Sequence, residues 1–211
     1  MAPKPTVFIV EDDVITRTIL CHVVDAMGLP AESFGSAEDF LAAFDVERSG
    51  CLISDLFLPG MSGLELQAVL SVKAVLLPVV VISGAADVPD AVRAMHQGAI
   101  TVLQKPVADS VLRETITRAL ARDAELREAE SRRREILRRV ARLTLHERSV
   151  MDLLVQGAGN KAIAFQLDFS LRTVEARRQS VLKKMEVNSL SELVAVLFVV
   201  RTDLPSLNPN N

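Results

Sequence analysis

Residues 6–13 read TVFIVEDD, an apolar run that ends in three acidic residues. Three later stretches also join an apolar run to a polar group: CLISD at 51–55, PVVVISG at 78–84 and AITVLQK at 99–105. Amphipathic stretches near residues 14–27, 36–47, 63–72 and 87–97 predict helices between them, and a further strand is expected near 30–34. This alternation predicts a doubly wound parallel sheet of five strands with helices on both faces.

The predicted strands end in carboxylates and one lysine, namely Asp12, Asp13, Asp55 and Lys105. Because parallel strands carry their ligand sites at their carboxyl ends, we expect these groups to meet in one crevice. Carboxylate oxygens suit Mg²⁺, and an ammonium beside them suits a phosphoryl group. Without a cation, mutual repulsion should raise the pKa of at least one carboxyl group. Taken singly, Asp12 or Asp13 also fits a helix N-cap, and Asp55 fits a turn.

Four ordered motifs resemble those of the response-regulator receiver domain, over about 120 residues. They are VEDD at 10–13, DLFLPGMSG at 55–63, SG at 83–84 and KP at 105–106. The resemblance implies a flavodoxin-like fold and a phosphoryl group accepted by Asp55 from a sensor histidine kinase. Ser83 would be the switch residue, although a hydroxyl at this place also fits the cap of a Ser-Gly turn.

The same resemblance implies a Mg²⁺ site and a partner for the phosphate. Lys105 would pair with phosphate oxygens, and similar domains suggest a cis bond between Lys105 and Pro106. The ligands of Mg²⁺ would be three carboxylates and one backbone carbonyl, from Asp12, Asp13, Asp55 and Phe57. We expect no turnover enzyme, only a receiver that assists its own phosphorylation and dephosphorylation. An aspartyl-nucleophile phosphatase is the competing class, but it requires a second Asp where Phe57 stands.

The fifth strand departs from the receiver pattern. The family carries Phe or Tyr three residues before the lysine, whereas this chain has Val102 and contains no tyrosine. In the family that ring turns inward as the switch hydroxyl moves, so Val102 puts this relay in doubt. The alternative to a phosphorylation switch is therefore an atypical receiver whose DNA binding does not depend on phosphorylation.

Residues 109–141 contain no Gly or Pro and predict one long helix. Its arginine run at 132–134 is expected to be a solvated face, with Glu side chains pairing at i, i+4. Four shorter helices should follow. We therefore predict a receiver domain at 5–122, a helical linker at 123–141 and an all-α helix-turn-helix domain of four helices at 142–204.

Composition and charge limit which partners and which location we expect for this chain. The chain has 211 residues and a formal net charge of −3, but residues 1–106 hold six Lys or Arg against thirteen Asp or Glu, and residues 107–211 hold eighteen against fourteen. The second half is only mildly basic, so charge by itself does not argue for DNA. Cys21 and Cys51 predict free thiols. The chain shows neither an apolar span of membrane length nor a signal peptide, so we expect a cytoplasmic protein without membrane contact.

From about residue 143 to 194 the chain resembles the helix-turn-helix domain of LuxR-type regulators, which is the output domain of the NarL/FixJ subfamily. The motif includes NKAIAFQL at 160–167 and LRTVEARRQSVLKKM at 171–185. Three residues depart from it: His146 replaces an Arg, Ala162 a Glu, and Arg177 a His. None of these changes disturbs the helical pattern.

The resemblance implies that residues 171–185 form a recognition helix that enters the major groove of promoter DNA. Base edges would be read by Glu175, Ala176 and Gln179. Phosphates would be contacted by cationic and hydroxyl side chains, with solvated surface residues as the alternative: Lys161, Arg172, Thr173, Arg177, Arg178 and Lys183. We expect phosphorylation to promote a homodimer, so that two recognition helices engage paired half-sites.

Overall fold

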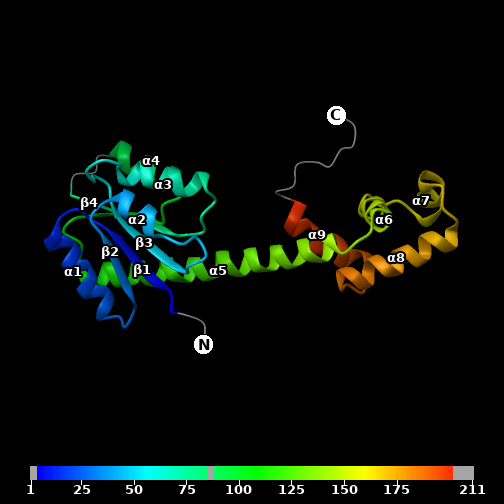
Figure 1. Cartoon of the computed structure of the whole chain (residues 1–211), viewed down its shortest axis with the longest axis horizontal. Helices are drawn as coiled ribbons and strands as arrows, with labels where there is room; N and C mark the ends of the chain where they lie inside the picture. The colour runs from blue at the N-terminus through cyan, green and yellow to red at the C-terminus, as the bar shows by residue number, and fades with distance from the viewer. Residues whose placement is uncertain (1–3, 85–87, 202–211) are drawn as a thin grey trace. The chain divides into compact units, whose positions relative to one another are not determined.

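The computed structural model describes residues 4–84 and 88–201. The chain divides into two compact units, Met1–Arg127 and Glu128–Asn211. The first contains a parallel sheet in the order β2-β1-β3-β4-β5, formed by β1 (Thr6–Val10), β2 (Ala31–Phe34), β3 (Gly50–Asp55), β4 (Val79–Ser83) and β5 (Thr101–Gln104) (Figure 1). The predicted doubly wound sheet is therefore confirmed.

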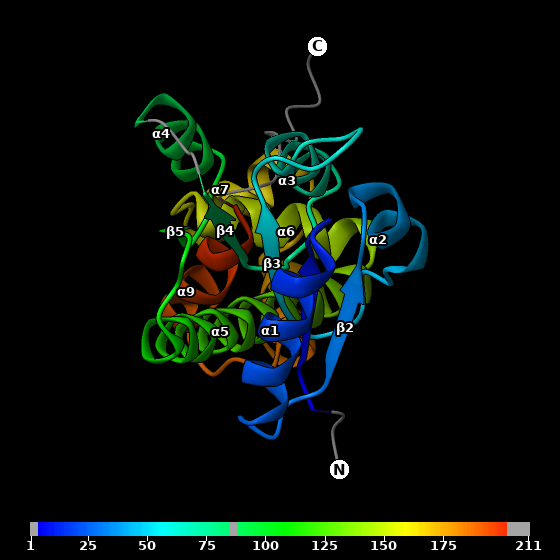
Figure 2. The ribbon, with the colours of Figure 1, turned by 90° about the vertical axis from the view of Figure 1, so that its left-hand side faces the viewer.

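Helices cover both faces of this sheet, as Figure 2 shows. They are α1 (Val14–Asp25), α2 (Ala37–Ala43), α3 (Gly63–Val72), α4 (Val88–His96) and the first half of α5 (Asp109–Ala141). Alternate residues of β1 serve the two faces. Val7 and Ile9 pack with α1 and α5, whereas Phe8 and Val10 pack with α2, α3 and α4. Because both faces are covered, β1 and β4 are almost entirely apolar, and all of their residues are buried.

The helix α5 remains attached to the first unit beyond the predicted boundary at residue 122. Asp123 is 2% exposed, and its carboxylate accepts hydrogen bonds from the backbone N–H of Gly50 at 3.0 Å and from Arg127 Nε at 2.8 Å. Arg127 also donates to the carbonyl of Glu47 at 3.1 Å. The start of the predicted linker is thus part of the first compact unit. Burial raises the pKa of Asp123, in spite of the hydrogen bond from Arg127.

The second unit contains the end of α5 followed by α6 (Leu145–Val155), α7 (Asn160–Leu167), α8 (Leu171–Met185) and α9 (Leu190–Arg201). Val174, Val181 and Met185 form the buried face of α8. The arginine run at 132–134 pairs with glutamates on its own helix, including Arg132 with Glu128 at 3.2 Å. The predicted ion-paired face is confirmed. Residues 202–204 of the predicted domain lie outside the described residues.

Two smaller predictions can be compared with the structure. Cys21 and Cys51 are free thiols, and burial raises the pKa of Cys51 to about 12. Among the described residues, no helix is both long and apolar enough to cross a membrane.

Candidate functional site

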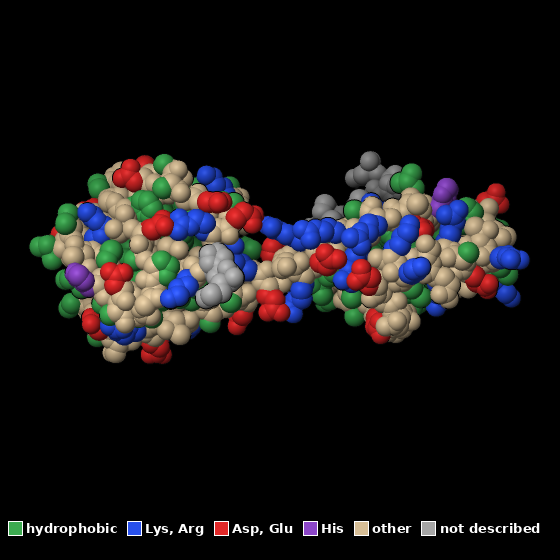
Figure 3. All heavy atoms as spheres, turned by 60° about the horizontal axis from the view of Figure 1, so that its bottom comes forward, with side chains coloured by type: hydrophobic (Ala, Val, Ile, Leu, Met, Phe, Trp, Pro, Cys, Tyr) green, Lys and Arg blue, Asp and Glu red, His purple; other side chains and the backbone are tan. Residues whose placement is uncertain are grey.

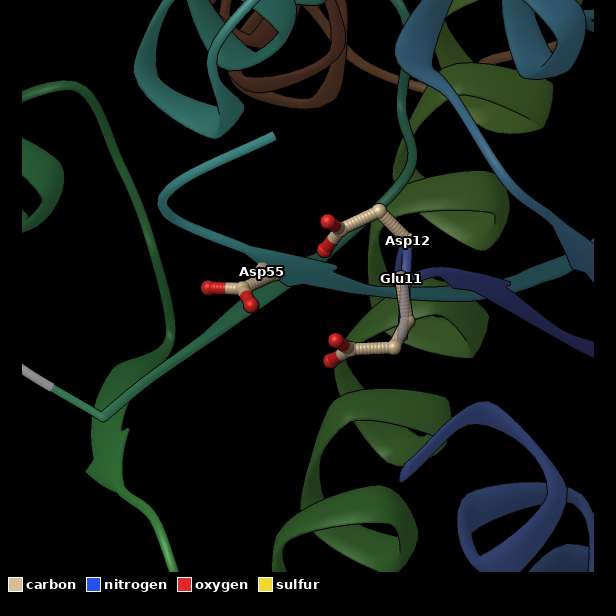
Figure 4. A group of neighbouring side chains, drawn as sticks. All are labelled: Glu11, Asp12 and Asp55. Carbon is tan, nitrogen blue, oxygen red and sulfur yellow. The ribbon is translucent and has the colours of Figure 1, made fainter. Parts of the chain in front are cut away.

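Three carboxylates converge at the carboxyl ends of β1 and β3. Glu11 and Asp12 follow β1, and Asp55 ends β3, which lies next to β1 in the sheet. Each offers an oxygen within 4.8 Å of the others, and Figure 4 shows the carboxylates facing one space. Glu11 and Asp55 are buried, whereas Asp12 is exposed. The order of strands reverses between β1 and β3, which is where ligands bind in sheets of this type.

Asp13 does not join this group, although the sequence predicted it as a metal ligand. Its side chain caps α1 by accepting a hydrogen bond from Thr16 N at 2.7 Å. Hydrogen bonding with Thr16, first with its side chain and then with its backbone N–H, lowers the pKa of Asp13. Glu11 occupies the place that was predicted for Asp13. The signal was present in the sequence, because Asp is a favoured N-cap directly before a helix and VITRTIL begins at the next residue.

Lys105 neutralises the buried carboxylates. Its Nζ lies 2.6 Å from Asp55 Oδ2 and 2.7 Å from Glu11 Oε2. Burial lowers the pKa of Lys105, but its hydrogen bonds with Asp55 and Glu11 outweigh burial and raise the pKa overall. The pKa of Glu11 is raised chiefly by burial, with a smaller contribution from the negative charge of Asp55. The Lys105–Pro106 bond is cis, as predicted.

The loop after Asp55 is held close to the site. The N–H of Phe57 donates to Asp55 Oδ1 at 3.2 Å, and Glu38 Oε1 accepts from Met61 N at 2.9 Å. Gly63 is the first residue of α3 and lies against the backbone of Asp55. A Cβ atom at position 63 would lie 2.2 Å from the carbonyl oxygen of Asp55. Only glycine fits at such a distance, so Gly63 allows α3 to start beside Asp55.

Ser83 and Val102 lie on the two neighbouring strands. Ser83 is fully buried at the end of β4, and Ile82 before it pairs with Asp55 in the sheet. Val102 is half-buried on β5 and lines an apolar hollow of about 640 Å³ together with α4 residues. The position that carries an aromatic ring in the receiver pattern therefore borders open space. Ser83 has the predicted location, at the carboxyl end of the strand beside Asp55.

The arrangement suits charge neutralisation around one nucleophilic carboxylate. Hard cations such as Mg²⁺ take oxygen ligands, and three carboxylate oxygens within 4.8 Å provide them. Asp55 is the central member, because one of its oxygens meets Lys105 and the other meets the N–H of Phe57. A phosphoryl group bound there would meet positive charge and a backbone donor.

The second unit contains a helix-turn-helix with the predicted bounds. The turn at residues 168–170 contains Asp168 at φ +54°, and Ser170 caps α8 by accepting from Thr173 N at 3.1 Å. Glu175, Ala176 and Gln179 are exposed on α8. The proposed phosphate contacts Lys161, Arg172 and Lys183 are exposed as well. Figure 3 shows Lys and Arg side chains over this unit, interspersed with acidic ones.

Two arginines of α8 contact protein groups. Arg178 donates to Asn160 Oδ1 at 3.3 Å, which connects α8 to the start of α7. Arg177 lies over the ring of Phe169, with Cζ 4.8 Å from the ring centroid. The phosphate contacts predicted for these two side chains therefore compete with contacts inside the domain.

Glu147 joins α6 to α8, a role that was not predicted from the sequence. Its carboxylate lies 2.7 Å from Lys184 Nζ and accepts from Ser180 Oγ at 2.6 Å. These contacts, with Lys184 contributing most, lower the pKa of Glu147 to about 2. It also forms a capping box with Thr144. The spacing T-x-x-E at 144–147 was the available signal, but it shows only the cap and not the contacts with α8.

Two family models match the chain. The response regulator receiver domain matches residues 7–117, and the luxR family of bacterial regulatory proteins matches residues 141–197. The chain is 37% identical over 194 residues to the transcriptional regulatory protein FixJ of Bradyrhizobium diazoefficiens, covering 92% of this chain and 95% of that protein. It is 40% identical over 193 residues to FixJ of Rhizobium meliloti, covering 90% and 93%.

Two solved structures also match most of the chain. The response regulator StyR matches with a TM-score of 0.80 and 37% identity, covering 93% of this chain and 99% of that one. Full-length FixJ from B. japonicum matches with a TM-score of 0.58 and 35% identity, covering 95% and 99%.

Proposed function

This chain belongs to the response regulators that join a receiver domain to a LuxR-type DNA-binding domain and regulate transcription, and we propose that a sensor histidine kinase switches it by phosphorylating Asp55. The observation that supports this most is the position of Asp55 between Lys105 and the acidic pair at the end of β1. A nucleophilic carboxylate needs neutralising charge beside it to accept a phosphoryl group, and this site provides it.

In the proposed reaction, a carboxylate oxygen of Asp55 attacks the phosphorus of a phosphohistidine. The P–N bond breaks, the imidazole leaves and an acyl phosphate forms on Asp55. Lys105 already lies 2.6 Å from this carboxylate, so its ammonium would pair with phosphoryl oxygens after transfer. The N–H of Phe57 would keep the acceptor carboxylate oriented. We also propose that the hydroxyl of Ser83 then bonds to the phosphoryl group as the switch.

Glu11, Asp12 and Asp55 would hold Mg²⁺, with the backbone carbonyl of Phe57 as a further ligand. The cation would supply positive charge to the phosphoryl oxygens. The three carboxylates carry more negative charge than Lys105 can balance, and this surplus supports a divalent cation as the partner of the site.

Phosphorylation would promote a homodimer, and the α4–β5 surface supports this part of the proposal. Val88 is 77% exposed, Val92 47% and Met95 49%, and these α4 side chains border the hollow beside Val102. Contiguous exposed apolar side chains mark interaction surfaces. In a dimer, binding of the first DNA-binding domain would hold the second one close to its half-site, so the second would bind at a high effective concentration. A small change in self-association would therefore strongly change promoter occupancy.

On DNA, α8 would be the recognition helix in the major groove. Glu175, Ala176 and Gln179 are exposed in its first half, where base edges would lie. Lys161, Arg172, Thr173, Arg178 and Lys183 are the proposed phosphate contacts.

A regulator that receives its signal from a kinase and binds promoter DNA would act in the cytoplasm.

The competing functions differ in their reactions. A receiver whose DNA binding is independent of phosphorylation is favoured by Val102, which lacks the ring of the usual relay. A phosphatase would release phosphate from esters repeatedly, whereas the proposed regulator accepts one phosphoryl group. Phosphate-ester turnover by the purified protein would contradict the proposed regulator.

The deciding experiment compares wild type with Asp55→Asn before and after treatment with acetyl phosphate or beryllofluoride. Gel filtration measures self-association, and selection from a pool of DNA sequences measures binding. We expect Mg²⁺-dependent dimerisation and tighter DNA binding in the wild type only. Identical behaviour of the two proteins would favour DNA binding that is independent of phosphorylation.

A further inference from the structure

The ring of Phe169, in the turn between α7 and α8, contacts a side chain from each of two helices. Arg177 of α8 places its Cζ 4.8 Å from the ring centroid. The imidazole of His146, near the start of α6, lies edge-to-face with the ring at a centroid distance of 5.4 Å and an interplanar angle of 61°. Both geometries are favourable for an aromatic ring. Phe169 therefore connects α6 and α8 to the turn of the helix-turn-helix.

Arg177 is held by the protein more closely than its exposed neighbours on α8. Its Nε is buried and has no hydrogen-bond partner among the described residues. Glu175 and Ala176, directly before it, are exposed. A buried N–H group without a partner costs free energy, so packing against Phe169 must compensate for this orientation. Part of the guanidinium thus faces the protein interior, although α8 presents other side chains to solvent.

The ring of Phe169 thus packs between one guanidinium and one imidazole, from α8 and α6. Side chains that share one packing site are energetically coupled, so exchanging the two residue types should keep one guanidinium and one imidazole at the ring. Two independent phosphate contacts would show no such coupling.

We propose that His146, Phe169 and Arg177 form a stack that positions the first two turns of α8, and that Arg177 is a positioning residue and not a phosphate contact. This inference rests on the proposed function, because it requires that α8 lies against DNA. It corrects the role expected for Arg177 and adds His146, which lies on a different helix from the other DNA-binding candidates.

The first test uses the full chain and a DNA sequence selected by the wild type. The variants are H146R, R177H and the double variant H146R/R177H. We expect each single variant to bind DNA roughly two- to fivefold more weakly, since each disturbs one contact with the ring of Phe169, and the double variant to return close to wild type. The control is Lys183→Gln, which removes an exposed cation from the same helix.

Salt dependence separates positioning from phosphate contact. Removing one cation that pairs with a DNA phosphate should reduce the slope of log affinity against log salt by about 0.9. We expect this reduction for Lys183→Gln and an unchanged slope for R177H and the double variant. A slope reduced equally in R177H and the double variant would identify Arg177 as a phosphate contact and overturn the proposal.

Thermal unfolding tests the stack without DNA. We expect both single variants to unfold at lower temperature than wild type, and the double variant to recover most of the loss. Additive losses in the double variant would mean that the two side chains are not coupled, and would also overturn the proposal. A wild-type protein that selects no DNA sequence would contradict the proposed function instead, and unfolding would still decide whether the stack exists.

Discussion

Lys105 donates from one ammonium group to the carboxylates of both Asp55 and Glu11, across 2.6 and 2.7 Å. These carboxylates belong to β3 and to the end of β1, while Lys105 follows β5 at the edge of the sheet. Glu11 and Asp55 carry like charges in a buried place, so their proximity is unfavourable without a cation between them. The lysine serves as that cation in the chain itself, and the proposed metal would add to it.

Replacing Lys105 by Met should make stability depend more strongly on Mg²⁺. Without the metal, we expect a loss of roughly 1–3 kcal/mol in the free energy of unfolding, because two buried carboxylates lose their partner. Added Mg²⁺ should stabilise the variant more than the wild type, since binding to the folded state shifts unfolding by mass action. Urea unfolding with and without MgCl₂ measures both. Exposed Lys73→Met is the control, and an equal Mg²⁺ effect in all three proteins would refute the prediction.

Glu11→Gln and Asp13→Asn should separate the two candidate metal ligands. We expect Glu11→Gln to weaken Mg²⁺ binding by roughly tenfold, because affinity follows the number of charged ligands. Asp13→Asn should leave it unchanged, because Asn also caps helices and Asp13 faces Thr16. Calorimetric titration with MgCl₂ provides the measurement. Weakening by Asp13→Asn as large as that by Glu11→Gln would restore the ligand set expected from sequence.

Stability of the DNA-binding unit should fall in acid through Glu147. The pKa of this carboxyl is lowered from 4.5 to about 2 in the folded protein, chiefly by Lys184. Its contribution is therefore complete above pH 4.5 and is lost as the pH falls from 4.5 towards 2. We expect a loss on the order of 2 kcal/mol over this range. Glu147→Gln should reduce the pH dependence of the unfolding temperature, and an unchanged profile would show that other groups dominate.

Asp123→Ala should destabilise the receiver by about 1–3 kcal/mol. The change leaves the buried N–H of Gly50 and the guanidinium of Arg127 without this acceptor. Glu125→Ala, which removes an exposed carboxylate two residues later on the same helix, should change stability by less than about 0.5 kcal/mol. Urea unfolding of the two variants provides the comparison. Similar losses would mean that Asp123 does not anchor α5.

The strands and helices were predictable because local patterns specify them. Buried strands such as β4 are continuous apolar runs, and the absence of Gly and Pro over residues 109–141 predicts a helix that the structure contains in full. The place of Asp55 also followed from sequence, because it ends a strand in a fold whose sites lie at strand ends. The bounds of α7 and α8 followed from the spacing of their apolar residues and from the turn between them.

Side-chain direction was less predictable. Glu11, Asp12 and Asp13 are consecutive, and the apolar run before them has no alternation that tells which ones face β3. The start of α1 decides this, because it turns Asp13 towards Thr16 and leaves Glu11 beside Asp55. Arg177 is a similar case. Its helical position allows an exposed side chain, and only the nearness of Phe169 shows the packing.

The sequence by itself determined the order of strands and helices, the position of Asp55 at a strand end and the helix-turn-helix, since these follow from short-range periodicity and from residue types at the ends of elements. Only the tertiary structure decided which carboxylates share Lys105, how far α5 is anchored to the receiver, and which arginines of α8 are held by protein groups. These contacts join residues far apart in the chain, and a direction of a side chain in space cannot be read from spacing along it.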